Sequence, residues 1–225
     1  MANNAIVNMF RVKEIRKRIF FTLLVLAVFR LGSVLTIPGI NPEALTTYFR
    51  SATGASNSFV DYMDFFAGGA FSNFSVFMLG VMPYISTQII LQLALIIFPS
   101  LKRIAQEDGG QKKIQSWTRI GTVFVCLIQS LAVTVYASNI PGAIVISNNF
   151  LFKMIAMISV TTGTMVTIWL GEQITARGIG NGISMLIFAG IVARLPSAVW
   201  ELGRLVAQDM SKLVSAIVVL IMFVG

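Results

Sequence analysis

Residues that could perform acid–base, nucleophilic or metal chemistry are scarce in this sequence. The 225-residue chain contains no histidine and a single cysteine, Cys126. A serine hydrolase needs a base beside its nucleophile, and a metal site needs a cluster of His, Cys or acidic ligands. Neither set can be assembled from these residue types. We therefore expect no enzymatic activity, no bound metal and no cofactor.

One glycine-rich stretch has a spacing that partly matches phosphate-binding loops. Residues Gly178–Gly182 read GIGNG. No strand pattern precedes them, and no Lys-Ser or Lys-Thr pair follows, as a phosphate-binding loop requires. We interpret the stretch as a tight turn before the next apolar segment, because glycine permits positive φ angles.

The elements that carry these residues are strongly apolar. Hydrophobic residues make up 56% of the chain and charged residues 12%, whereas charged residues are roughly a quarter of a soluble domain. Stretches of about 20 apolar residues, the length that crosses a bilayer, recur along the sequence. The sequence therefore predicts an all-α multispanning membrane protein with a single membrane domain over residues 1–225. The expected spans are 19–37, 74–98, 120–137, 150–170, 183–199 and 213–225.

Two features at the ends of the chain affect this interpretation. Bases precede the first expected span, as in a signal peptide, but the apolar stretch continues past Arg30 and further spans follow. We therefore reject a cleaved signal peptide. The last expected span stops at Gly225 without a flanking charge or loop, which we interpret as a cut within a longer protein.

The acidic residues all lie outside the expected spans. Ionisable groups within the membrane are the usual mark of proton relays and ion-coupled transporters. Their placement therefore argues against a proton-driven pump. The nine acids are Glu14, Glu43, Asp61, Asp64, Glu107, Asp108, Glu172, Glu201 and Asp209.

The basic residues are distributed unequally between alternate loops. With a cytoplasmic N-terminus, eleven lie inside and five outside, and Arg30 lies within the first span. Cytoplasmic loops carry the excess of Lys and Arg in membrane proteins. The sequence therefore predicts a cytoplasmic N-terminus and cytoplasmic loops at 99–118 and 171–182. The inner bases are Arg11, Lys13, Arg16, Lys17, Arg18, Lys102, Arg103, Lys112, Lys113, Arg119 and Arg177.

Polar residues interrupt the second and third spans. One interpretation is hydrogen bonding between helices, and the other is a wet cavity or a seam that opens. The residue pattern leaves both open. The residues concerned are Ser86, Thr87, Gln88 and Gln92 after Pro83, and Gln129 with Ser130 in the third span.

The stretch before the second span is half-polar and broken by glycine. Residues 67–75 read AGGAFSNFS, a poor sequence for a helix that faces lipid. Gly68 and Gly69 each weaken a helix by roughly 1 kcal/mol relative to alanine. Irregular backbone at membrane depth is tolerated only where it lines a cavity or is buried in protein.

Two long motifs in this sequence resemble the SecY family, whose members are the central subunit of the protein translocase. They are MDFFAGGAFSNFSVFMLGVMPYISTQIILQL (63–93) and WLGEQITARGIGNGISMLIFAGIVARLP (169–196). FRLGSVLTIPGI (29–40) and RIGTVFVCLIQS (119–130) extend the resemblance. It implies a fold of ten helices in two inverted halves, of which this chain supplies the first half, spans 1–5, and part of span 6.

The resemblance also implies three groups of site residues. A pore ring of aliphatic side chains would contain Val81, Ile85, Ile183 and Ile187, and each pair is spaced so that it shares one helix face. Lateral-gate candidates are Ser86, Gln92 and Gln129. A re-entrant plug helix would fold into the external funnel, over Asp61, Tyr62, Met63, Asp64, Phe65, Phe66, Ala67, Gly68, Gly69, Ala70, Phe71, Ser72 and Asn73.

The function that the resemblance implies is a protein-conducting channel. It would move unfolded polypeptides across the cell inner membrane, and insert membrane proteins into it, through a plugged pore and a lateral gate. The implied partners are SecE, SecG, the SecA motor ATPase, the ribosome, signal sequences, unfolded polypeptides and membrane lipids, without direct sequence-specific binding of nucleic acid. The alternative is a secondary transporter of a small solute with discontinuous helices, an architecture that Gly- and Pro-interrupted spans also fit.

Overall fold

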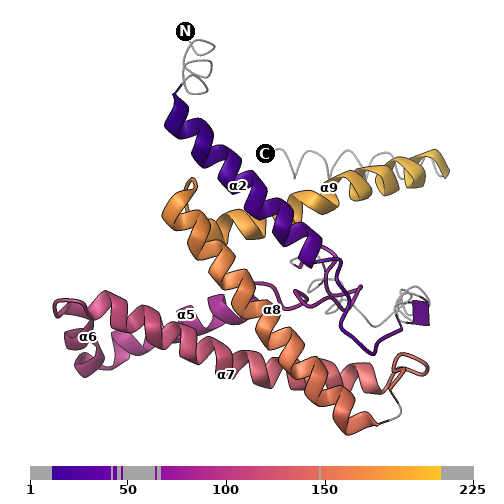
Figure 1. Cartoon of the computed structure of the whole chain (residues 1–225), viewed down its shortest axis with the longest axis horizontal. Helices are drawn as coiled ribbons and strands as arrows, with labels where there is room; N and C mark the ends of the chain where they lie inside the picture. Colours follow the sequence, from indigo (N-terminus) through magenta and orange to yellow (C-terminus); the bar gives the residue numbers. More distant parts are fainter. Residues whose placement is uncertain are drawn as a thin grey trace.

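The computed structural model describes residues 12–208 except 42, 45–46, 48–63, 65–66 and 147. Within these ranges the chain is helical, with two isolated β-bridges, Thr36–Ser75 and Ile40–Ile144 (Figure 1). The helices are α2 (Lys13–Gly32), α5 (Met82–Ile97), α6 (Pro99–Gln106), α7 (Gly110–Ser138), α8 (Asn149–Arg177) and α9 (Gly182–Gln208).

The helices pack in a defined order around α8. Helix α7 lies between α5 and α8, while α2 and α9 contact each other and the other side of α8 (Figure 1). The buried side of α7, which packs against α5 and α8, carries small and hydroxyl residues, and such residues let membrane helices approach closely. On α7 the buried residues recur nearly every fourth position: Thr118, Thr122, Cys126, Ser130, Thr134 and Ala137.

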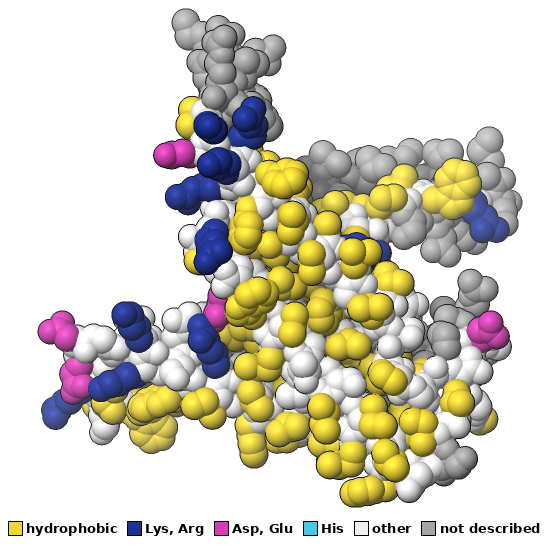
Figure 2. All heavy atoms as spheres, in the orientation of Figure 1, with side chains coloured by type: hydrophobic (Ala, Val, Ile, Leu, Met, Phe, Trp, Pro, Cys, Tyr) yellow, Lys and Arg dark blue, Asp and Glu magenta, His cyan; other side chains and the backbone are white. Residues whose placement is uncertain are grey.

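Large apolar side chains cover the outside of the helices. Ile96 and Trp200, for example, are 77% and 74% exposed. Figure 2 shows apolar side chains over most of the visible face, with bases gathered at the start of α2 and around α6. Helices α7 and α8 are long and apolar enough to cross a membrane, and α5 with α6 forms a third, bent candidate. The expected span 213–225 lies outside the described residues.

Helix boundaries extend beyond several of the expected spans. The expected fourth span ended at Leu170, whereas α8 continues to Arg177. The apolar run stops at Leu170, but the following residues still suit a helix, and Arg177 interacts favourably with the C-terminal end of the helix dipole. Much of the expected loop 171–182 is therefore helical. The remaining residues 178–181 connect α8 to α9, and Asn181 Oδ1 caps α9 by accepting from the Ile183 backbone N–H at 3.0 Å.

The expected loop 99–118 is also largely helical. Helix α5 ends at Ile97, and α6 leaves it at an angle of 106°. Phe98 between them is extended, with ψ 105°, because a residue before proline avoids the helical region. Pro99 then begins α6, where its missing N–H costs no helical hydrogen bond.

The second expected span differs from the structure in its first part. It was expected to begin at Phe74, but residues 67–81 form consecutive turns and the helix begins at Met82. Gly68, Gly69 and Gly80 adopt φ angles of 64°, 94° and 51°, which the helical conformation excludes. Pro83 lies in the first turn of α5, so it starts this helix and does not interrupt it.

Candidate functional site

The turn segment 67–81 is anchored in the centre of the described structure. The Ile37 backbone N–H donates to the Phe74 carbonyl at 3.0 Å, and the Val76 N–H donates to the Leu35 carbonyl at 2.9 Å. The aromatic rings of Phe71 and Phe74 are buried in the main hydrophobic core. Strand-like pairing and apolar burial therefore hold the second half of this segment in place.

The first half of the segment lies directly against α9. A Cβ atom added at Gly68 would lie 2.9 Å from the Gly190 Cα, closer than real Cβ atoms approach. The backbones of Gly68 and Gly190 thus touch without intervening side chains. Gly69 lies against the guanidinium group of Arg194, one helical turn further along α9.

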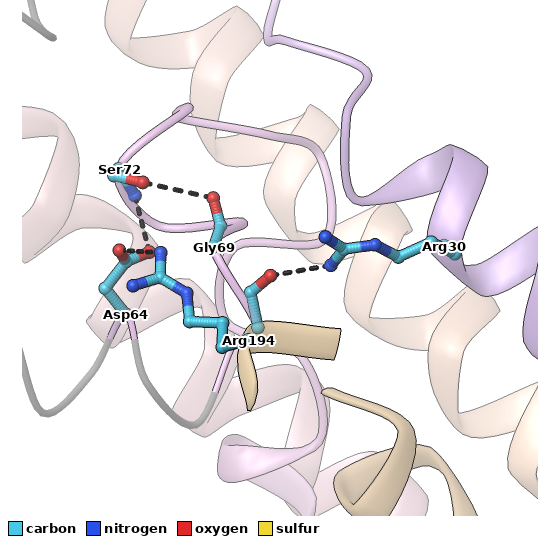
Figure 3. Close-up of polar contacts among 6 residues, drawn as sticks. Arg30, Asp64, Gly69, Ser72 and Arg194 are labelled. Carbon is cyan, nitrogen blue, oxygen red and sulfur yellow. Dashed lines mark hydrogen bonds and ion pairs between the residues drawn. The ribbon is translucent and has the colours of Figure 1, made fainter. Parts of the chain in front are cut away.

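Polar contacts join the same half of the segment, together with Asp64 just before it, to two helices (Figure 3). Arg194 of α9 forms an ion pair with Asp64, and the other carboxylate oxygen accepts from the Ser72 backbone N–H at 2.8 Å. Arg30 of α2 donates from Nη1 to the Gly68 carbonyl at 2.6 Å. Of the plug residues expected from sequence, Asp61, Tyr62, Met63, Phe65 and Phe66 lie outside the described residues.

An apolar cavity of about 350 Å³ lies under this segment. Ala67 and Phe71 of the segment line it, together with Phe29 of α2. Three residues of the expected pore ring line it as well: Val81, Ile85 and Ile187. The structure therefore brings most of the expected ring together with the described part of the expected plug.

A second cavity, of about 700 Å³, has a polar lining. Ile85 and Ile187 line this cavity too. Ile183, the remaining ring residue, lines this cavity and not the apolar one. Its polar residues include Gln88, Gln115, Gln173 and Asn181. Aliphatic side chains of α5 and α9 thus stand between an apolar and a polar cavity.

The three expected gate residues are separated. Ser86 and Gln129 line the apolar cavity, on the facing helices α5 and α7. Gln92 lines a different cavity of about 380 Å³, with Lys112 and Gln115. Gln92 lies a turn and a half beyond Ser86 along α5, and the structure does not bring it to the other two.

A bidentate ion pair crosses the polar cavity. Arg119 of α7 donates from Nε and Nη2 to the two carboxylate oxygens of Glu172 on α8, at 2.9 and 2.7 Å. Such two-point contacts fix the relative orientation of both groups. Sequence reasoning placed Glu172 outside the spans and took Arg119 only as a topology signal. Both residues line the polar cavity.

Sequence reasoning also missed the roles of Arg30 and Arg194 beside the turn segment. Arg30 carried a signal, because an ionisable residue inside a membrane span indicates a functional contact by default. Arg194 also lies within an expected span, 183–199, but it stands near the outer end of that span and was counted as an outer base. Within the described residues, no group of three or more His, Cys, Asp or Glu side chains could hold a metal ion.

Comparisons with known proteins agree with this arrangement. The family model "SecY" matches residues 75–225. The chain is 46% identical to "Protein translocase subunit SecY" of Borreliella burgdorferi over 214 residues, which are 95% of this chain and 48% of that protein. The chain spans about half the length of the curated relatives it matches.

Two solved structures share the fold. "Sec61 in the Canine ribosome-channel complex from the endoplasmic reticulum" aligns with a TM-score of 0.60 at 19% identity, over 95% of this chain and 48% of that one. A SecY structure whose title says that its plug domain stabilises the closed state of the translocation channel aligns with a TM-score of 0.58 at 19% identity, over 95% and 47%. The family match, the identity and the shared all-helical fold agree, and the chain belongs to the SecY family.

Proposed function

We propose that this chain forms part of the wall of a protein-conducting channel, which moves unfolded polypeptides across a membrane and inserts membrane proteins into it. One observation carries the proposal. Ala67 and Phe71 of the turn segment line an apolar cavity, and Ile85 and Ile187 line both this cavity and a polar one, so an aliphatic ring would stand between the two. This arrangement is that of a plugged pore with a polar entrance.

The constriction suits a channel that must stay tight to ions. Val81, Ile85, Ile183 and Ile187 present no hydrogen-bonding groups, so water between them is poorly held. Hydrophobic constrictions gate by dewetting, which resists ions. Aliphatic side chains can also change rotamer around a polypeptide of varying width. The rest of the ring would come from further helices of the complete channel.

We assign residues 61–73 as the plug. Ala67 and Phe71 line the apolar cavity, and we infer that a segment at this place closes the pore until it moves. The related SecY structure, whose title names a plug domain, supports the assignment. Ser86 and Gln129 face the same cavity from α5 and α7, which supports a role for them in a lateral gate. The position of Gln92 supports a role on the polar side of the pore.

The charge distribution supports a cytoplasmic N-terminus in the cell inner membrane. Bases gather at the start of α2 and around α6 (Figure 2), as expected for the inner face. We therefore propose that 99–118 and 171–182 face the cytoplasm. This basic face suits an acidic or phosphate-rich partner, such as the ribosome, and the SecA motor ATPase. SecE and SecG would be the accompanying subunits.

Reconstitution tests the proposed function against the alternative of a secondary transporter. Proteoliposomes would hold the complete channel that contains this chain. With SecA and ATP, we expect an unfolded precursor polypeptide to become protected from external protease. ATP omission is the control. Accumulation of a small solute along an ion gradient, without protection of the polypeptide, would show that the chain belongs to a transporter.

A further inference from the structure

Two arginines from different helices hold the first half of the turn segment. Arg30 stands on α2 and Arg194 on α9, and Figure 3 shows both guanidinium groups directed at the segment from different sides. Arg194 pairs with the Asp64 side chain, and Arg30 binds the Gly68 carbonyl. The segment therefore has a charged contact to each of the two helices that flank it.

The Asp64 carboxylate organises the segment as well as binding α9. Its second oxygen accepts from the Ser72 backbone N–H at 2.8 Å, and Ser72 Oγ donates to the Gly69 carbonyl at 3.2 Å. Asp64 and Ser72 thus close a hydrogen-bonded loop. The loop and its attachment to Arg194 depend on the same carboxylate.

The exposure of these groups makes the contacts strong but reversible. The Asp64 side chain is 10% exposed, whereas that of Arg194 is 33% exposed. A cavity of about 360 Å³ with a mainly polar lining borders Arg30, Ser72 and Arg194. Water in such a cavity can solvate both guanidinium groups once the segment leaves. Separating the ion pair therefore costs less than leaving an arginine in a dry interior.

We propose that Arg30 and Arg194 are positioning residues that latch the plug in the closed channel, and that the Asp64–Arg194 ion pair must break before the plug leaves. This inference rests on the proposed function. It identifies the groups that hold the closed state. It also gives Arg194 a role beyond the charge asymmetry that sets the membrane topology. The second half of the segment, whose backbone is hydrogen-bonded to residues 35–37, stays anchored. The first half would move relative to it, as about a hinge.

The test measures how often the segment leaves its place. Ala70 is fully buried in the segment, so Ala70→Cys in a Cys126→Ala background reports opening through its reaction with an external maleimide. The complete channel, otherwise free of cysteine, is used in its resting state. When closing is faster than labelling, the labelling rate follows the open population.

Asp64→Asn and Arg194→Met should each raise the labelling rate about tenfold, which corresponds to about 1.4 kcal/mol in the opening equilibrium. Asp64→Asn retains an acceptor for the Ser72 N–H, so it removes the charge and leaves the loop intact. The double variant should label no faster than the faster single variant, because both lose the same interaction. Arg194→Lys should restore slow labelling.

Arg204→Met is the control on the same helix, because it removes an exposed arginine from α9. The latch is wrong if Arg194→Met labels like Arg204→Met, or if the effects of Asp64→Asn and Arg194→Met add. Translocation of an unfolded polypeptide is measured on the same samples. Failure of the parent channel to translocate would refute the proposed function. Normal translocation, with labelling rates that Asp64→Asn and Arg194→Met leave unchanged, would refute the latch alone.

Discussion

Replacing Gly68 by alanine is expected to displace the segment that we propose as the plug. Gly68 has a φ of 64°, and its backbone touches Gly190 of α9. The added Cβ would lie 2.9 Å from both the Cα and the carbonyl oxygen of Gly190. These are backbone atoms of a packed helix, which cannot turn aside as a flexible side chain does. The segment must therefore move away from α9.

The expected magnitude combines two costs. An alanine in the left-handed region costs about 1–2 kcal/mol, and overpacking against a rigid neighbour costs about 1–3 kcal/mol. Both costs apply only while the segment lies against α9, because a released segment can relax its backbone and is separated from α9. A total of about 2–5 kcal/mol raises the open population at least about 30-fold, since each 1.4 kcal/mol is a factor of ten.

Resting ion conductance of the reconstituted channel is the appropriate assay. We expect Gly68→Ala to leak ions in the absence of a translocating polypeptide, while the variant still assembles. Gly142→Ala is the matched control, because Gly142 also has a positive φ, 76°, but its added Cβ would find no atom closer than 3.9 Å. A folded Gly68→Ala channel as tight as the parent would show that Gly68 does not rest on α9 in the closed state.

Three further substitutions test other parts of the site. Changing both Ile85 and Ile187 to serine should wet the constriction and raise resting conductance while translocation continues. Arg119→Met should lower the free energy of unfolding by about 0.5–1 kcal/mol, because the pair with Glu172 is partly exposed and such pairs contribute little. Gly163→Ala should lower it by about 1–3 kcal/mol, as seen in thermal denaturation, since its Cβ would overlap the Val76 carbonyl.

Each of these variants has a control of the same chemistry. Ile96 and Ile158 are exposed on the outside of α5 and α8, and serine at both should leave resting conductance unchanged. Arg103→Met removes a base of α6 that forms no salt bridge within the described residues. Gly203 has no atom within 4 Å of its added Cβ, so Gly203→Ala should be neutral or stabilising. Equal effects of a variant and its control would contradict the contact in question.

The helical fold was predictable because apolar stretches of membrane length leave few alternatives. The positions of α7, α8 and α9 follow their apolar runs, and these helices overlap the expected spans. Their ends did not follow from hydropathy. Helix α8 continues through Glu172 because a helix needs satisfied backbone hydrogen bonds and a cap, and neither requirement ends at the last apolar residue.

The candidate site was predictable only where residues share one element. Ile85 follows Val81 by four positions at the start of α5, and Ile183 and Ile187 have the same spacing on α9, so the shared face of each pair could be read from the sequence. A short helix was expected up to Asn73 and the second span from Phe74, whereas residues 67–81 form turns. Phe74–Val81 is apolar enough to suggest a helix. The contacts of Arg30 and Arg194 join residues far apart in the chain, and no local pattern predicts them.

The structure separates permanent contacts from reversible ones by their chemistry. The buried side of α7 carries small and hydroxyl side chains, and Thr122 and Thr134 donate from Oγ1 to the carbonyls of Thr118 and Ser130 in the same helix, at 2.6 Å each. Separating α7 from its neighbours would break this close packing without giving these two hydroxyl groups a new partner. The proposed plug instead rests on a glycine contact and two guanidinium groups beside a polar cavity, so water can replace the polar contacts that its departure breaks. A segment held in this way can leave and return while the helices around it stay packed.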